Sequence, residues 1–385
     1  MNKILLSISC LSLVVMSQYM GAQNYPLSDP TNTGNWVLNP DVSDEFETST
    51  INENKWLIQG RNGVYQSNFR GRAPSQFSTD NAKQENGKLK IETRWEPNYN
   101  FSPTTNANGE VYQNITTAAV ISKTLFQYGY MEIMSKAAKA EITSSFWTTG
   151  NQSELDMFEM FGDPQPGEAN ANWAKRLKFN MISWNPNNPY YLPDGNGPAH
   201  TRNIQANFNT ADAFHVYGFE WTPNYIKVYI DGVLHPNGSI LKSEITNNGT
   251  DNNRWVTDVP YRLWFDSETF PWLGLPEAED LPANYEIEYI RIWQSETLGI
   301  TNFSKVDHSF KIYPTPFDRS KIDNLKISAP NASEISLFNI SGVEMLKINK
   351  TSEPFVLQVS NLSPGFYFIA VRIGESIKTK KILIN

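Results

Sequence analysis

Three carboxylates lie close together in an apolar segment, Ser153–Gly162 (SELDMFEMFG). In a β-strand, side chains two residues apart share a face, so Glu154 and Asp156 would point away from the core together. Strict alternation would then bury Glu159, and a lone buried carboxylate is unfavourable unless its pKa shifts strongly. One inserted residue, a β-bulge at Met157–Phe158, would return Glu159 to the acid face. We therefore predict a bulged strand with all three acids on one side.

Such a row could hydrolyse a glycosidic bond. A retaining glycosidase needs two carboxyl groups about 5–5.5 Å apart. With the bulge absorbing one residue, Glu154 and Glu159 are four steps apart, roughly 13 Å between Cα atoms, and glutamate side chains that lean together can close most of that gap. We assign Glu154 as nucleophile, Glu159 as acid/base and Asp156 as the group that orients Glu154, although the spacing allows the reverse. Because the three acids are close, at least one pKa must rise.

The same pattern has two other interpretations. It could be the acidic outer face of a half-exposed strand, with no chemistry attached. Three carboxylates also suit calcium or magnesium. A strand, however, spreads its oxygens along a line and not around a point, which makes a metal site the weakest of the three interpretations.

The beginning of the chain has the features of an export signal. Lys3 precedes an apolar stretch, Ile4–Met16, that is too short to cross a bilayer, and Ala22 is a plausible cleavage point. We predict a signal peptide over 1–22. The single cysteine, Cys10, lies inside it, so the mature protein would have no disulfide. We expect a protein without a membrane span that reaches the cell surface or the medium through the periplasm.

Residues 23–295 have the pattern of an all-β domain. Short apolar runs alternate with polar loops, Asp231-Gly232 between two such runs signals a hairpin, and no helical period is sustained. A formal net charge of −8 offers no broad positive field for nucleic acid. The pattern predicts a two-sheet β-sandwich. The strand candidates are 88–95, 117–122, 129–135, 177–184, 214–221, 225–230, 261–266 and 285–293.

The surroundings of the acids are similar to one glycosidase family. Trp147 stands seven residues before Glu154, and the domain contains SDEF at 43–46, GRAPSQF at 71–77 and YEIEYIRIWQ at 285–294. Together with ExDxxE, these segments resemble glycoside hydrolase family 16, whose motif is ExDxE or its bulged form.

The resemblance implies a β-jelly roll with a concave cleft for polysaccharide, and an endo-acting retaining hydrolase that needs no cofactor. It implies the same roles for the acids: Glu154 as nucleophile, Asp156 as its supporting acid and Glu159 as acid/base. A structural calcium ion would fit the family, but no ligand set is identifiable in the sequence. The competing class is a polysaccharide-binding jelly roll without activity.

The substrate class follows from smaller features. The bulged motif is shared by laminarinases and by the red-algal galactan enzymes, but the Trp-Pro that laminarinases carry before the acids is absent here. GRAPSQF resembles the galactan enzymes, and LWFDSETFPWLGLPEAEDLPANYEIEYIRIWQ is most similar to κ-carrageenases. We expect cleavage of internal β-1,4-galactosidic bonds in κ-carrageenan or furcellaran, with agar, porphyran and then laminarin as alternatives.

Eight residues are candidates for contacts with the sugar or its sulfate groups. Arginine binds sulfate with two parallel hydrogen bonds, although solvated loop charges would explain the three arginines equally well. Aromatic rings could stack on sugars, Trp147 being the best placed, and an amide could bond hydroxyls; core packing is the alternative for the later tryptophans. The candidates are Arg61, Arg70, Arg72, Trp147, Asn180, Trp184, Trp264 and Trp272.

The end of the chain forms a separate region. A polar linker at 296–309 leads to short strands over 310–385, with YPTPF at 313–317, LSPGFY at 362–367 and a basic final strand. This order resembles the C-terminal sorting domain of the type IX secretion system, with a binding or spacer module as the alternative. We therefore divide the chain into 1–22, 23–295, 296–309 and 310–385. Its expected partners are the secretion machinery and a polysaccharide, and we expect a monomer.

Overall fold

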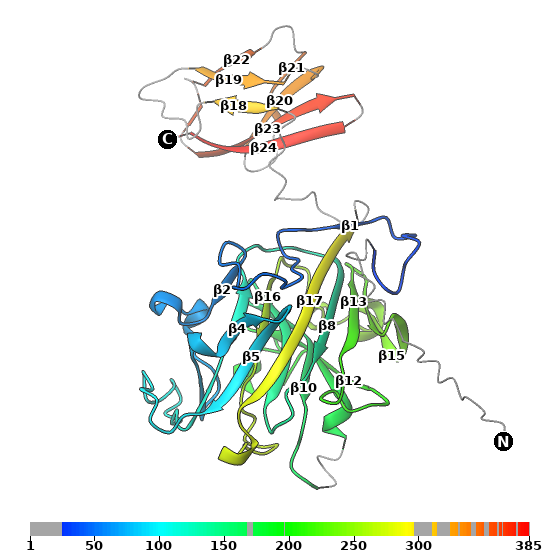
Figure 1. Cartoon of the computed structure of the whole chain (residues 1–385). Coiled ribbons are helices and arrows are strands. Elements are labelled where there is room, and N and C mark those ends of the chain that lie inside the picture. The colour runs from blue at the N-terminus through cyan, green and yellow to red at the C-terminus, as the bar shows by residue number, and fades with distance from the viewer. Residues whose placement is uncertain are drawn as a thin grey trace, which may run out of the picture. The chain divides into compact units, whose positions relative to one another are not determined.

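The computed structural model describes two compact units, Met1–Thr301 and Asn302–Asn385 (Figure 1). The described residues are 25–167, 172–195, 197–295, 310–313, 324–329, 332–339, 344–349, 354–359, 362–363, 365–374 and 376–384. The expected signal peptide, the linker and residues 314–317 of the YPTPF motif lie outside them.

The first unit consists of two sheets. The smaller sheet is antiparallel throughout and has seven strands. Its order is β12 (His200–Gln205), β11 (Arg176–Ser183), β10 (Ser153–Phe161), β9 (Thr143–Gly150), β16 (Arg262–Asp266), β7 (Ala119–Ser122) and β2 (Trp56–Ile58).

The larger sheet has ten strands. Its main path is β15 (Val233–Leu241), β14 (Tyr225–Ile230), β13 (His215–Trp221), β8 (Gly129–Lys136), β17 (Ala283–Ser295), β5 (Lys88–Trp95), β6 (Ile115–Thr117) and β3 (Ser75–Phe77). Off this path, β1 (Trp36–Leu38) pairs with β17 and β4 (Ala82–Glu85) pairs with β5. The pairing of β3 with β6 is parallel.

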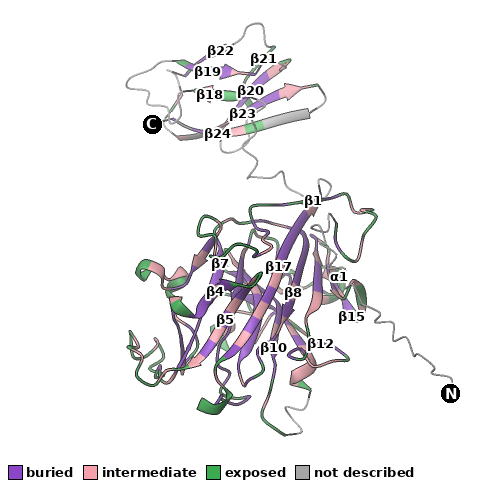
Figure 2. Cartoon of the chain, viewed as in Figure 1, coloured by how far each residue is buried: buried purple, intermediate pink, exposed green. Residues whose placement is uncertain are grey.

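The core lies between the two sheets, and long stretches of the strands that line it are buried (Figure 2). On β10 and β9 it receives Phe158 and Phe146, which contact Phe219 of the larger sheet with ring centroids 6.1 Å apart in each case. Phe146 also stacks on Phe265 of β16 at 5.4 Å. Aromatic packing of this kind fixes the smaller sheet against the larger one.

The expected strands agree well with those observed. Segments 88–95 and 225–230 match β5 and β14 to the residue, whereas 117–122 divides into β6 and β7. The predicted hairpin turn is confirmed, because Asp231 (φ 50°) and Gly232 (φ 78°) both adopt the left-handed backbone of a type I′ turn. The described residues contain one short α-helix, α1 (Lys242–Ile245). The all-β sandwich is therefore confirmed.

The second unit has its own core and two small sheets. The first is β18 (Lys311–Tyr313), β19 (Asn324–Ser328) and β22 (Phe355–Gln358). The second is β21 (Glu344–Asn349), β20 (Glu334–Asn339), β23 (Gly365–Ile373) and β24 (Ser376–Ile384). Leu325, Ile335 and Ile369 are among the side chains buried between them. Within the described part of the chain, no helix is long and apolar enough to cross a membrane.

Candidate active site

β10 carries an extra residue where the sequence predicts a bulge. Asp156 pairs with Trp147 of β9, but Phe158 pairs with Phe146, the residue just before Trp147, so Met157 has no opposite residue. The pairing with β11 is shifted at the same place. The predicted bulge is confirmed.

The bulge returns Glu159 to the face of the other two acids. Met157 and Phe158 are both fully buried, so two consecutive side chains enter the core and the alternation restarts one residue later. One amide group then reaches two acids: Asn180 Nδ2 donates to Asp156 Oδ2 and to Glu159 Oε2, at 2.9 Å each. We call the surface formed by Glu154, Asp156 and Glu159, with the side chains beside them on the seven-stranded sheet, the acid face.

Neighbouring strands hold the acids in place. Trp184, just after β11, donates its indole N–H to Glu154 Oε2 at 2.9 Å. Thr201 of β12 donates to Asn180 Oδ1 at 2.7 Å, which fixes the orientation of the amide that bridges two of the acids. Glu154 is in turn hydrogen-bonded to Asp156. The three acids are therefore joined in one polar chain.

Burial changes the protonation of this chain. It raises the pKa of Glu154 to about 7, with the charge of Glu159 adding to the effect and the Trp184 hydrogen bond opposing it. Burial also raises the pKa of Asp156, and the charges of Glu154 and Glu159 raise it further. The expectation that at least one of the three acids has a raised pKa is met by two of them.

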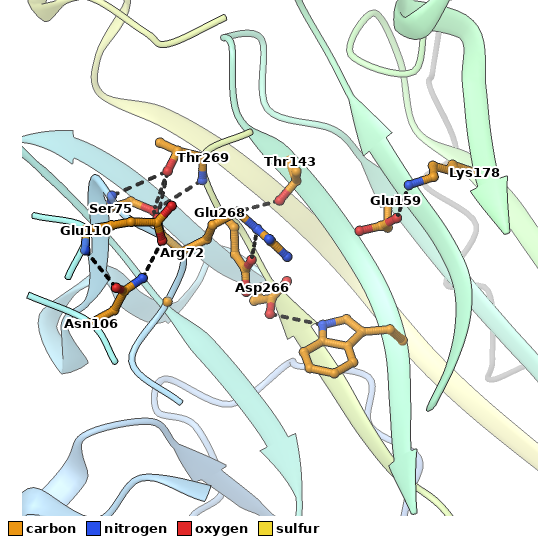
Figure 3. A network of polar contacts seen from close by, with 12 residues as sticks. Arg72, Ser75, Asn106, Glu110, Thr143, Glu159, Lys178, Asp266, Glu268 and Thr269 are labelled. Carbon is orange, nitrogen blue, oxygen red and sulfur yellow. Dashed lines mark hydrogen bonds and ion pairs between the residues drawn. The ribbon is translucent and has the colours of Figure 1, made fainter. Parts of the chain in front are cut away.

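A second pair of acids lies on the same face, at the end of β16. Asp266 and Glu159 are opposite the same residue of β9, Ser145. Trp147 Nε1 donates to Asp266 Oδ2 at 3.0 Å, and Glu268 forms a 3.2 Å ion pair with Arg72 (Figure 3). Burial raises the pKa of both acids. The acid face thus has five carboxyl groups among the described residues.

Two of the proposed sugar-binding residues are not available for that role. Trp264 is 1% exposed, because it packs beneath Trp147 with ring centroids 4.6 Å apart. Asn180 is 2% exposed and both hydrogens of its amide are used by Asp156 and Glu159. The prediction of direct sugar contacts is therefore wrong for these two: Trp264 supports Trp147, and Asn180 positions the acids.

Of the three arginines, the structure brings one to the acid face. Arg72 lies there through its contact with Glu268 (Figure 3). Arg70 lies over the ring of Tyr65, 4.0 Å from its centroid, and Arg61 forms an ion pair with Glu53 at 3.4 Å. Among the described residues, no contact links Arg61 or Arg70 to the acids.

The other three candidate tryptophans have rings that are exposed or half-buried. Trp272 is 60% exposed and stacks on Phe270 at 4.6 Å, with the Arg72 guanidinium 5.4 Å from its ring. Trp184 is 40% exposed while its indole N–H holds Glu154. Trp147 is half-buried. These rings are open for stacking on a sugar.

Sequence reasoning missed Asp266 and Glu268. The signal was present in LWFDSETF, where Trp264, Asp266 and Glu268 recur at every second position, the spacing used above for Glu154 and Asp156. It also missed Lys178, which forms an ion pair with Glu159 at 3.2 Å.

Comparison with known proteins identifies the family. Residues 36–295, which hold both sheets and all five acids, match the family described as "Beta-porphyranase A-D, GH16 domain". The chain belongs to this family. Residues 311–385 match the family described as "Secretion system C-terminal sorting domain". The resemblance to glycoside hydrolase family 16 and that to the type IX sorting domain are both confirmed.

Individual relatives agree with the family. Beta-porphyranase D of Zobellia galactanivorans is 27% identical over 66% of this chain and 59% of its own length. Kappa-carrageenase of Pseudoalteromonas carrageenovora is 26% identical over 74% of this chain and 71% of its own. The crystal structure of porphyranase B from Z. galactanivorans has a TM-score of 0.54 at 26% identity, covering 67% of this chain and 92% of that one. The jelly-roll fold and the glycoside hydrolase class are therefore confirmed.

Proposed function

We propose that this family member is an endo-acting, retaining galactanase that cleaves β-1,4-galactosidic bonds of porphyran. One observation carries the reaction: the bulge in β10 puts Glu154, Asp156 and Glu159 on one face, where the Asn180 amide bridges Asp156 and Glu159. The family description supports the substrate, because it is the porphyranase domain that matches.

The reaction follows from the roles of the two glutamates. Glu159 gives its proton to the glycosidic oxygen while a carboxylate oxygen of Glu154 attacks the anomeric carbon and the leaving sugar departs. Water then loses a proton to Glu159 and attacks the same carbon, which releases Glu154 and restores the original stereochemistry. Asp156 and Trp184 hold Glu154 in the orientation that attack requires. Each step uses carboxyl groups of the chain and water, so we expect the reaction to need no cofactor.

The protonation state of Glu154 sets a lower pH limit. As nucleophile it must be ionised, and burial raises its pKa to about 7. Activity should therefore rise as the pH passes through about 7, and a bound sugar that excludes more water would move this limb further up.

κ-Carrageenan is the second candidate substrate. It was the first expectation from the sequence, and the relative described as kappa-carrageenase matches 74% of this chain. The porphyranase family match spans residues 36–295, which hold both sheets and all five acids, and this is why we now place porphyran first. In either case Trp184 and Trp272 offer exposed rings for stacking, and Arg72 a cation for sulfate.

A panel of porphyran, κ-carrageenan, furcellaran, agarose and laminarin tests the substrate. We expect new reducing ends and a ladder of oligosaccharides from porphyran. Binding without any product would overturn the enzyme in favour of a polysaccharide-binding jelly roll. Azide tests the roles: rescue of Glu154→Ala with an inverted glycosyl azide supports Glu154 as nucleophile, and rescue of Glu159→Ala with a retained azide supports Glu159 as acid/base.

The second unit directs the protein out of the cell. A sorting domain of this family indicates a secreted or cell-surface protein. We propose that the type IX machinery recognises residues 311–385 and that the porphyranase domain acts as a monomer. Deletion of 302–385 should leave the enzyme inside a host that has this machinery, as fractionation would show.

A further inference from the structure

The ion pair between Lys178 and Glu159 belongs to the acid face but has no part in the reaction described above. Lys178 Nζ lies 3.2 Å from Glu159 Oε2, and Asn180 Nδ2 lies 2.9 Å from the same oxygen. Lys178 and Glu159 are directly opposite each other on β11 and β10, so the contact is built into the strand register. Among the described residues, no hydrogen bond or ion pair reaches Glu159 Oε1. The two oxygens of this carboxyl group therefore differ in their contacts, because Lys178 and Asn180 both contact Oε2.

The charges around Glu159 are mostly negative. Nearby acids oppose the ionisation of a carboxyl group, whereas a cation in contact with that group favours its ionisation. Arg72 is committed to Glu268, so Lys178 is the cation that contacts Glu159 in the described structure. The charged groups that face Glu159 are Glu154 and Asp156 from β10, Asp266 and Glu268 from the end of β16, Lys178 from β11, and Arg72 from the loop before β3.

We propose that Lys178 is a positioning residue for the proton donor: it holds Glu159 through Oε2 and leaves Oε1 to carry the proton to and from the substrate. This role rests on the proposed function. In the first step the Oε1–H bond breaks and the proton passes to the leaving oxygen; in the second, water returns a proton to Oε1. The ionised form between the two steps is stabilised by the Lys178 ammonium group, against the surrounding acids.

Replacing Lys178 by an uncharged residue should move the pH dependence of kcat/KM in a predictable direction. Without Lys178, no cation in contact offsets the acids around Glu159, so we expect the alkaline limb of kcat/KM to move to higher pH. At a contact distance and partial exposure of this kind, the expected shift is about 0.5–1 pH unit. The acidic limb, which reports Glu154, should move less, because Lys178 does not contact Glu154.

The test is the pH dependence of kcat/KM for three variants of the full chain on the galactan that the wild type cuts. Lys178→Met should shift the alkaline limb, Lys178→Gln, which keeps a donor without the charge, should shift it equally, and Lys178→Arg should leave it near the wild-type position. The matched control is Lys136→Met. Lys136 and Glu286 are also directly opposite, on β8 and β17, with side chains 30% and 17% exposed against 27% and 17% for Lys178 and Glu159.

We expect Lys136→Met to leave both limbs in place. An unmoved alkaline limb in folded Lys178→Met or Lys178→Gln overturns the role of Lys178 and leaves the proposed function standing. An equal shift in Lys136→Met overturns it too, since the effect would then be one of net charge. A wild-type protein that cuts no galactan overturns the proposed function and this role with it.

Discussion

Both sheets of the first unit bury carboxylates on their outer faces, but the two sheets differ in the hydrogen-bond donors that they provide for these carboxylates. On the ten-stranded sheet, fully buried Glu132 accepts the backbone N–H of Leu27 at 2.7 Å and the hydroxyl of Tyr289 at 3.1 Å. Nearby, Glu45 receives two parallel hydrogen bonds of 2.8 Å from Arg291. Each of these acids has donors of its own, and together they fasten the N-terminal segment to β8 and β17.

On the seven-stranded sheet, donors are fewer and are shared. One amide serves both Asp156 and Glu159, while Glu154 and Asp266 each receive one indole N–H. Buried polar groups in a folded core are normally satisfied by protein partners. Acids left short of donors keep free oxygens, which costs stability and leaves them able to exchange protons with a substrate. Burial raises the pKa of Glu132 as well, so the difference between the two sheets lies in the donors and not in the pKa. The contrast separates carboxylates that fasten the fold from those placed for chemistry.

The largest difference between the two sheets should be in activity. Glu154→Gln removes the nucleophile and should lower kcat by more than about 10⁴-fold, and Glu159→Gln should lower it by about 10²–10⁴-fold. Glu132→Gln keeps the shape of an equally buried side chain on the other sheet and should retain near wild-type activity. Release of reducing sugar by purified variants measures all three. Comparable loss in folded Glu132→Gln would remove the distinction between the sheets.

For stability, we expect Glu132 of the ten-stranded sheet to matter more than the acids of the seven-stranded sheet. Glu132→Ala leaves the Leu27 N–H and the Tyr289 hydroxyl without their acceptor and opens a cavity, so the free energy of unfolding should fall by about 2–4 kcal/mol. Urea unfolding at pH 7 measures this loss. A variant as stable as the wild type would show that Glu132 does not fasten the N-terminal segment.

The position of the acids could be predicted from sequence because the physics is local. Alternation, together with the cost of burying Glu159, was enough to predict the bulge at Met157–Phe158. Exposure was harder to predict, since alternation gives the face of a strand but not what covers it. Trp264 has the right face, yet Trp147 from the neighbouring strand lies over it.

The contacts between strands could not be predicted from local spacing. Asn180 was chosen for its face, but its partners follow from the register of β11 against the bulged β10. Asp266 and Glu268 have the same two-residue spacing as the catalytic acids, and only the pairing of β16 with β9 brings them beside Glu159. Register between distant segments depends on the whole sheet, so a single sequence does not reveal it.

A smaller effect should come from the indole that holds the nucleophile. The Trp184 hydrogen bond opposes the burial that raises the pKa of Glu154, so Trp184→Phe, which keeps a ring for stacking, should raise that pKa above about 7. The acidic limb of kcat/KM should then move up by about half a pH unit. A pH–rate profile measures it. An unchanged acidic limb beside a raised KM would mean that Trp184 acts only by stacking.

The smallest effect tests the cost of an acid that is short of donors. Asp266 is 1% exposed and its pKa is raised by burial, so ionising it costs the folded protein free energy above the pKa of the unfolded chain, near pH 4. Asp266→Asn keeps an acceptor for Trp147 Nε1 and removes that cost. It should be more stable than the wild type at pH 8 and no more stable at pH 4, as urea unfolding at the two pH values would show. Asp44, whose Oδ2 accepts the Trp56 indole N–H at 2.8 Å in the N-terminal segment, is the matched control. Because Asp44 is only half-buried, Asp44→Asn should bring no gain at pH 8, and an equal gain there would show that the cost is not particular to the acid face.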